Sequence, residues 1–247
     1  MIDIVPIKPR VGVIGGMGPE ATVLLMQRII AMTAARDDSD HVPLLVDNNT
    51  QIPSRIKAII EKTGVDPGPV LANMARQLEA SGAAALAMPC NTAHHYAPVI
   101  EKAVEIPLLN MVELSAKCVA DMDLPKKRVG ILASPAVRLT ALFDRAFSSY
   151  QIETIYPVDQ GGMLDAIRSV KAQGANRDAC QIMESAAREL MPCSDILIIA
   201  CSELSIIADA IPAGFPRLDT LDILAQAVIK FSGSCQTGSD SNVLDVV

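Results

Sequence analysis

The sequence predicts an α/β fold made of two similar, doubly wound parallel-sheet lobes, related by a pseudo-twofold axis and with an active site between them. Short β-branched runs alternate with stretches of helical periodicity, which is the pattern of parallel strands joined by crossover helices. The chain also repeats itself, because Val11–Gly15 and Val129–Ala133 are both strand-like runs that pass into a turn of small residues and then a helix. We therefore expect two lobes of one topology.

The expected elements follow one another as this fold requires. Short apolar runs predict strands over Val11–Ile14, Pro43–Asp47, Ala83–Met88, Pro107–Leu109, Arg128–Ala133, Ile152–Ile155 and Asp195–Ala200. Apolar residues at helical spacing predict helices over Pro19–Arg36, Val70–Ser81, Thr92–Val104, Val112–Met122, Pro135–Tyr150, Asn176–Met191 and Thr220–Phe231.

The repeat also predicts the domain organisation. The first lobe would span residues 1–110 and the second residues 111–219, with the last helix, about 220–231, returning to the first lobe. Residues 232–247 form a polar tail whose Gly and Ser content is typical of a linker. With 247 residues, 50 % of them hydrophobic, the chain is long enough to bury the core of such a fold.

The composition excludes several classes of partner. The 21 Lys and Arg residues against 28 Asp and Glu residues give a net charge of −7, the wrong sign for binding nucleic acid, and aromatic residues that could stack on bases make up only 3 %. No apolar stretch is long enough to cross a bilayer, and Met1–Arg10 lacks the features of a secretory signal peptide. We expect a cytoplasmic protein that binds neither nucleic acid nor a membrane.

The six cysteines are scattered without CxxC spacing, which argues against a disulfide framework and against a structural zinc site. Two of them, Cys90 and Cys201, each follow a buried-looking strand and precede a helix, at corresponding positions of the two repeats. The other four lack this placement and are interpreted as structural: Cys118, Cys180, Cys193 and Cys235.

The position of Cys90 and Cys201 indicates their chemistry. Parallel α/β sheets bind ligands where their strands end, and a helix N-terminus favours a thiolate, so we expect each thiol pKa to fall toward neutrality. If the lobes face each other, the two sulfurs approach one ligand from opposite sides. A thiolate that removes a proton from one face of a carbon, and a thiol that returns one to the other face, need neither a metal nor another cofactor.

Other side chains near these strand ends could bind a carboxylate. Arg55, in the polar loop Asp47–Arg55, could hold one with two hydrogen bonds. Lys171 has the spacing of a solvated helical face as much as that of a ligand-binding residue. Four residues and their backbone N–H groups could stabilise charge that develops at an α-carboxylate: Asn91, Thr92, Ser134 and Ser202.

The glycine-rich turn allows a different function. Gly16, Gly18 and Ala21 have the spacing of a dinucleotide-binding turn between a strand and a helix. Pro19 at the first helical position, and the absence of an acidic strand end before Asp47, speak against a nicotinamide cofactor. The same turn would let backbone N–H groups approach a small carboxylate.

A covalent mechanism is a further alternative. His94 or His95 follows Cys90 by about one helical turn and could pair with it as a nucleophile and base. No third residue that would orient the histidine is visible from the spacing.

Four motifs together resemble those of aspartate racemases in the aspartate/glutamate racemase superfamily. They are Gly15-Gly16-Met17-Gly18-Pro19, Asn48-Asn49-x-Gln51-Ile52-Pro53-x-Arg55, Pro89-Cys90-Asn91-Thr92-Ala93-His94 and Cys201-Ser202-Glu203-Leu204. The resemblance extends from about Arg10 to Phe231. It implies a homodimer that racemises aspartate, and possibly glutamate, without pyridoxal phosphate, with Cys90 and Cys201 as the acid–base pair.

The resemblance also assigns residues to the substrate. Arg55 and Lys171 would meet its side-chain carboxylate, and seven residues would line the site: Met17, Gln51, Asn91, Thr92, Ser134, Ser202 and Glu203. Ser134 and Ser202 stand where the family commonly has Thr, and Ala200 where it has Gly, so we expect altered affinity rather than lost chemistry.

Some alternatives stay open beside a racemase. The Asp-Ser turn of the glutamate racemases of cell-wall synthesis is absent, because Gly15-Gly16-Met17 occupies its place. The same fold also serves isomerases and decarboxylases of small dicarboxylates, and the presence of both thiols argues against the single-cysteine decarboxylases. A non-catalytic protein that binds an acidic ligand is the alternative from another class.

Overall fold

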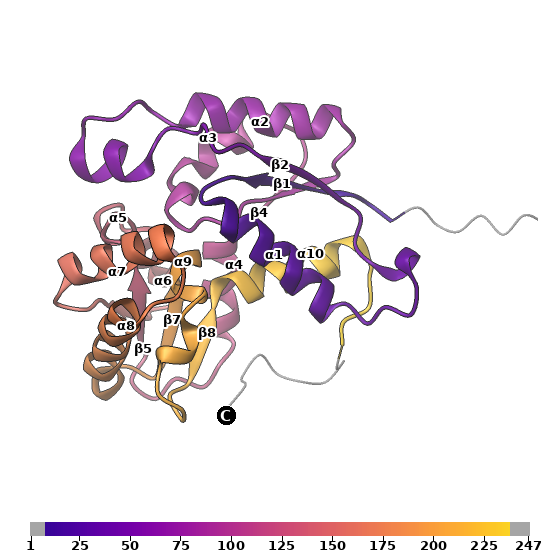
Figure 1. Ribbon diagram of the computed structural model, residues 1–247. Coiled ribbons are helices and arrows are strands. Elements are labelled where there is room, and N and C mark those ends of the chain that lie inside the picture. The colour runs from indigo at the N-terminus through magenta and orange to yellow at the C-terminus, as the bar shows by residue number, and fades with distance from the viewer. Residues whose placement is uncertain (1–7, 238–247) are drawn as a thin grey trace, which may run out of the picture.

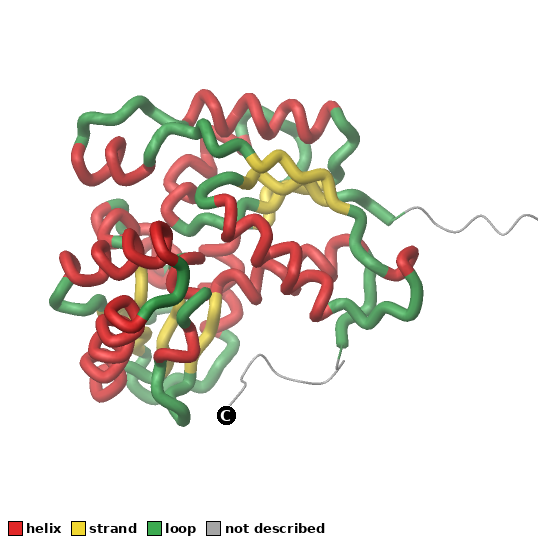
Figure 2. The backbone as a smooth tube through the Cα atoms, in the orientation of Figure 1, coloured by secondary structure: helices red, strands yellow, loops and turns green. Residues whose placement is uncertain are grey.

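The chain folds into two four-stranded parallel sheets, each flanked by helices, and this confirms the predicted fold class (Figures 1 and 2). The computed structural model describes residues 8–237. The first sheet has the order β2-β1-β3-β4, with β1 (Val11–Gly15), β2 (Leu44–Asn48), β3 (Ala85–Ala87) and β4 (Leu108–Leu109). The second has the corresponding order β6-β5-β7-β8, with β5 (Arg128–Ala133), β6 (Glu153–Ile155), β7 (Ile196–Ala200) and β8 (Arg217–Asp219).

Helices follow the strands in both lobes. They are α1 (Pro19–Met32), α2 (Gly68–Ala80), α3 (Ala97–Glu101), α4 (Met111–Ala120), α5 (Pro135–Leu139), α6 (Leu142–Ser148), α7 (Gln160–Gln173), α8 (Arg177–Leu190), α9 (Ser202–Ser205) and α10 (Thr220–Ser232). Shorter turns of 3-10 helix are η1 (Asp38–Asp40), η3 (Thr92–Tyr96), η4 (Met191–Cys193) and η5 (Ala208–Ala210), and η2 (Ile56–Glu61) is a π-helix. None of the helices found in residues 8–237 combines the length and the apolar character needed to cross a bilayer.

Strands β1 and β5, which occupy equivalent places in the two sheets, each carry a glycine that admits a helix close to the sheet. A Cβ built on Gly12 of β1 would lie 3.1 Å from the Cβ of Leu78 in α2. A Cβ on Gly130 of β5 would lie 3.1 Å from the Cβ of Leu190 in α8. The repeated glycine is therefore a packing requirement that both lobes share.

A common core joins the lobes through α4 and α10, which follow the equivalent strands β4 and β8. Asn110 caps α4 by accepting hydrogen bonds from the backbone of Val112 and Glu113, and Asp219 caps α10 by accepting one from Leu221. Helix α10 packs against both α1 and α4, and one buried apolar cluster draws side chains from both sheets and these helices. The two outer faces have separate cores, under α2 and under α7 and α8.

Polar contacts also hold α10 in this shared core. Arg28 of α1 forms ion pairs with Asp219 at 2.8 Å and with Asp222 at 2.7 Å. Thr220, the first residue of α10, donates a hydrogen bond to the carbonyl of Ile199 in β7. The start of α10 is thus fixed to both lobes. The domain boundaries stay a prediction, and residues 238–247 of the predicted polar tail lie outside the described residues.

Some predicted elements were wrong in detail. The helix expected over Thr92–Val104 is a 3-10 turn followed by the short α3, in which Pro98 occupies the first turn. The helix expected over Pro135–Tyr150 is divided at Ala141, whose φ of 48° is left-handed. Strand β8 was missed, because Arg217 and Asp219 leave only one apolar residue between them and no run that periodicity could detect.

Candidate active site

Cys90 and Cys201 line one cavity of about 60 Å³ between the two lobes, just beyond the equivalent strands β3 and β7. The first lobe contributes Met17, Ser54, Arg55, Ile56, Cys90, Asn91 and Thr92. The second contributes Ser134, Ile167, Lys171, Ala200, Cys201, Ser202 and Glu203. Parallel strands end at one edge of their sheet, which is why residues so distant in sequence meet here.

Gln51 does not line this cavity, unlike the other residues assigned to the site from the sequence. It is exposed, and its side-chain amide donates a hydrogen bond to the hydroxyl of Thr50. Three lining residues were not singled out by sequence: Ser54, Ile56 and Ile167. The first two flank Arg55, and Ile167 precedes Lys171 by four residues on α7, so helical spacing could have found it.

The glycine-rich turn brings Met17 to the cavity. Gly16 has a φ of 91°, and its N–H donates to the hydroxyl of Thr22 in α1 at 2.9 Å. A Cβ at Gly16 would collide with the backbone of Asn49, in the loop that leads to Arg55. The turn therefore packs directly on the loop beside it, and only glycine fits there.

The segment after Arg55 reaches across to the second lobe. The π-helix η2 contacts α5, and Glu61 at its end pairs with Arg168 of α7 at 3.6 Å. Both carboxylate and guanidinium are largely exposed, so the pair contributes little stability by itself. The loop itself lines the cavity with Ser54, Arg55 and Ile56 and thus forms one of its walls.

Both ring nitrogens of His94 form hydrogen bonds with the backbone, one with Cys90 and one with Met111. Its Nε2 accepts a hydrogen bond from the N–H of Met111 at 3.2 Å, so Nδ1 must carry the proton that it donates to the carbonyl of Cys90 at 2.9 Å. Burial lowers the pKa of His94 to about 4. Both ring nitrogens are thus occupied, which argues against His94 as a base for the Cys90 thiol. His95 is exposed.

This burial predicts a pH dependence of folding. The unfolded chain protonates His94 near its ordinary pKa of about 6.5, whereas the folded chain does so only near pH 4. Between these values the unfolded state binds the extra proton, so the free energy of unfolding should fall as the pH falls, by up to about 1.4 kcal/mol per pH unit. Urea unfolding at a series of pH values measures this slope.

Glutamine substitutions supply the comparison. His94→Gln should lose this part of the slope, and His95→Gln, which changes the exposed neighbour, should keep it. Equal slopes in the two variants would contradict the assignment to His94.

The Cys201 thiol differs from the sequence-based expectation. Burial and the neighbouring carboxylate of Glu203 raise its pKa well above the ordinary value, and the charge of Cys90 acts in the same direction. The expected lowering by a helix N-terminus was wrong here, because α9 has only four residues while Glu203 Oε2 lies 3.1 Å from the sulfur.

Cationic and polar groups converge from both lobes. Arg55 donates from Nη1 to the carbonyl of Pro53, while its buried Nε has no hydrogen-bond partner within residues 8–237. Lys171 Nζ lies 3.4 Å from Glu203 Oε1. Asn91 donates to the hydroxyl of Thr220 at 2.9 Å, which leaves its buried Oδ1 without a partner in the described part of the chain. Arg55 and Asn91 both line the cavity, and each keeps one buried polar atom without a partner in the described part of the chain.

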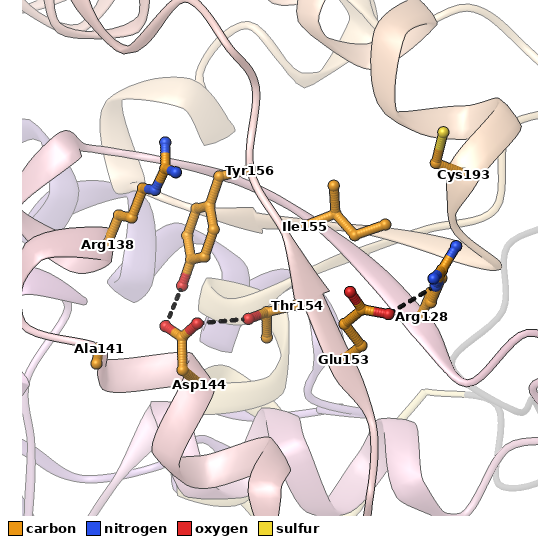
Figure 3. A pocket seen from close by; sticks show the side chains of 9 residues that line it. All are labelled: Arg128, Arg138, Ala141, Asp144, Glu153, Thr154, Ile155, Tyr156 and Cys193. Carbon is orange, nitrogen blue, oxygen red and sulfur yellow. Dashed lines mark hydrogen bonds and ion pairs between the residues drawn. The ribbon is translucent and has the colours of Figure 1, made fainter.

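A larger, more open hollow of about 630 Å³ lies on the second lobe (Figure 3). Its polar side chains already bind one another: Tyr156 and Thr154 both donate to Asp144 at 2.7 Å, and Arg128 pairs with Glu153. None of the residues assigned to the site from the sequence lines it. Size alone therefore does not locate the candidate site.

Comparison with known proteins assigns the class that this fold and site define. Residues 14–228 match the family model of Asp/Glu/hydantoin racemases. The solved aspartate racemase of Picrophilus torridus is 30 % identical, with a TM-score of 0.83 over 93 % of this chain and 96 % of that one. The chain therefore belongs to the Asp/Glu/hydantoin racemase family. It is a racemase, and hence an isomerase.

Two further relatives are more distant. The broad specificity amino-acid racemase RacX of Bacillus subtilis (strain 168) is 24 % identical over 89 % of this chain and 96 % of its own length. The glutamate racemase of Francisella tularensis subsp. tularensis SCHU S4, solved with D-glutamate, is 16 % identical with a TM-score of 0.64, over 95 % of this chain and 85 % of that one. The latter similarity concerns the fold alone.

Proposed function

We propose that this racemase interconverts L- and D-aspartate, with glutamate as a second candidate substrate, by two-cysteine proton transfer at Cα without pyridoxal phosphate or a metal. The observation that carries the proposal is the presence of Cys90 and Cys201 in one cavity, each contributed by the same strand end of its lobe. One thiolate removes the α-proton, the electron pair is delocalised into the α-carboxylate, and the opposite thiol delivers a proton to the other face.

The charges around the cavity support an acidic substrate. Arg55 and Lys171 enter from opposite lobes, and the unpartnered Nε of Arg55 suits a carboxylate oxygen. The free Oδ1 of Asn91 can accept a hydrogen bond from the substrate ammonium. Ser134 and Ser202 have hydroxyl groups that can donate to the α-carboxylate as negative charge develops on it.

The comparisons support the same choice of substrate class. A relative that is 30 % identical is named an aspartate racemase, and another is named a broad specificity amino-acid racemase. Aspartate is accordingly the first substrate to test, with other amino acids beside it. The predicted homodimer and cytoplasmic location stay predictions.

Deuterium incorporation tests the mechanism. Each enantiomer of aspartate is incubated with the protein in D₂O, and the Cα hydrogen is followed by proton NMR while chiral chromatography separates the products. With two different proton donors, deuterium should appear in the enantiomer formed and, at low conversion, be nearly absent from recovered substrate. Equal labelling of both would contradict two-cysteine transfer, and absence of labelling from aspartate, glutamate and alanine would end the proposal.

Arg55→Ala should impair dicarboxylates selectively. Loss of the guanidinium removes a charged hydrogen bond to the side-chain carboxylate, so we expect kcat/KM for aspartate to fall by about 10- to 100-fold, mostly through KM. Alanine, if it is turned over, should change little. Arg76→Ala removes the same charge from an exposed position on α2 and serves as the control. An equal loss for aspartate and alanine would contradict this role for Arg55.

A further inference from the structure

The surroundings of the two site cysteines are unequal. The Sγ of Cys201 donates a hydrogen bond to Glu203 Oε2 at 3.1 Å, and Lys171 Nζ lies 3.4 Å from the other oxygen of the same carboxylate. Ser202 adds a longer hydrogen bond of 3.4 Å to Oε2. No carboxylate hydrogen-bonded to the sulfur of Cys90 is found in residues 8–237. The pseudo-symmetry of the lobes is therefore broken at the atoms proposed to react.

Several charged groups act on the Cys201 sulfur. Glu203 on α9 is the nearest, Lys171 on α7 partly neutralises Glu203, and Arg55 and Cys90 face the same cavity from the first lobe. A carboxylate at hydrogen-bond distance stabilises S–H and opposes S⁻, because the thiol donates to it while a thiolate would repel it. Lys171 is half exposed, so solvent weakens its opposing effect on the sulfur.

We propose that Glu203 is a positioning residue that keeps Cys201 protonated in the resting site, so that Cys201 begins the reaction as the acid and Cys90 as the base. This inference rests on the proposed function. The resemblance assigned Glu203 only to the residues that line the substrate. Its hydrogen bond to the Cys201 sulfur gives it the further role of holding that thiol in the protonated form.

The proton balance follows from this resting state. Cys90 S⁻ takes the α-proton of one enantiomer, forming S–H as the C–H bond breaks. The S–H bond of Cys201 then breaks as a new C–H bond forms on the opposite face. Product release leaves Cys90 protonated and Cys201 as a thiolate beside Glu203, which is the less stable form. A proton from solvent returns to Cys201, and Cys90 gives one up to solvent.

This inequality has a kinetic signature. Enantiomers have equal free energy in water, so kcat/KM must be equal in the two directions whatever the protein does. In steady-state turnover, a bias in the resting protonation state therefore appears as different kcat and KM values for the two enantiomers and leaves kcat/KM equal. In Glu203→Gln the amide can donate to a Cys201 thiolate, so we expect the ratio of the two kcat values to change while the two kcat/KM values stay equal to each other.

Alkylation by iodoacetamide gives a readout that requires no turnover. The intact protein is alkylated across a pH series, and the rates at Cys90 and Cys201 are separated by mass spectrometry of their peptides. At neutral pH the native protein should react at Cys90 first. In Glu203→Gln the Cys201 rate should rise about tenfold or more, because loss of the carboxylate lowers the pKa of the Cys201 thiol, with little change at Cys90.

Controls separate this effect from altered structure. Glu101→Gln makes the same change at the exposed end of α3, outside the cavity, and should leave both rates unchanged. If Glu203→Gln fails to fold, Lys171→Gln takes its place. That change leaves Glu203 without its cation and should slow Cys201 alkylation about threefold.

The two proposals can fail separately. An unchanged Cys201 rate in folded Glu203→Gln, or faster Cys201 alkylation in Lys171→Gln, would overturn the role of Glu203 even if racemisation proceeds. The expected alkylation pattern with no deuterium labelling of any amino acid would uphold the thiol inequality and reject the proposed function.

Discussion

Cys90→Ser and Cys201→Ser should each lower the rate of aspartate racemisation by about 10³-fold or more, while the fold is retained. Both side chains are almost fully buried in the cavity between the lobes, and serine has nearly the same shape. A hydroxyl has a much higher pKa than a thiol, so it is a far weaker acid and supplies almost no base. Because the proposed reaction needs one group on each face, either change removes it.

Partial activities distinguish the two cysteines. The variant that keeps Cys90 should still exchange the α-hydrogen of one enantiomer for deuterium slowly, without inverting it, and the variant that keeps Cys201 should act on the other enantiomer. Chiral chromatography measures inversion, and NMR measures exchange in the same sample.

Two other cysteines provide matched controls. Cys118→Ser and Cys180→Ser make the same atomic change at half-buried positions outside the cavity, and both should keep full racemisation. Near-native activity in either the Cys90 or the Cys201 variant would show that the paired mechanism is wrong.

Gly16→Ala should destabilise the protein by about 2–5 kcal/mol and abolish most activity. The left-handed φ of Gly16 costs about 1–2 kcal/mol for a residue with a Cβ, and the collision of that Cβ with the Asn49 backbone adds the cost of overpacking. Relief of the collision requires the turn or the loop to move. Either movement displaces Met17 or the loop that carries Arg55, so binding should suffer as well as stability.

Gly233→Ala separates these two costs. Gly233 at the end of α10 is left-handed, with a φ of 71° and a ψ of 17°, but a Cβ there meets nothing within 4 Å. This variant should lose only about 1–2 kcal/mol and keep its activity. Urea unfolding measures both free energies, and a loss in Gly16→Ala no larger than that in Gly233→Ala would show that close approach to Asn49 is not what requires glycine.

The shared core has a consequence for how the cavity is held. Asn91 beside Cys90 donates to Thr220, and Thr220 in turn donates to the carbonyl of Ile199, two residues before Cys201. A short hydrogen-bonded path through the start of α10 therefore connects the two cysteine-bearing segments. Arg28 anchors the same helix start to α1. The geometry of the cavity therefore depends on these contacts at the start of α10 as well as on either sheet.

The sequence by itself determined the α/β class, the two lobes of one topology and the racemase family. These were accessible because they depend on local patterns: apolar runs of strand length, helical periods, and the glycine–strand units of Val11–Gly15 and Val129–Ala133, whose repetition is visible without coordinates. Cys90 and Cys201 stood out for the same reason, since each follows a recognisable strand.

Only the tertiary structure decided what surrounds these residues. Strand β8 has no apolar run and is defined by its pairing with β7, and Gln51 lies in the predicted motif but outside the cavity. His94 owes its low pKa to burial, which the hydrogen bond to the Cys90 carbonyl offsets only in part. The Cys201 pKa moves opposite to the sequence-based expectation, because desolvation and a carboxylate 3.1 Å away outweigh a one-turn helix. Electrostatic and steric effects depend on distance in space and on exclusion of water, and spacing along a chain specifies neither.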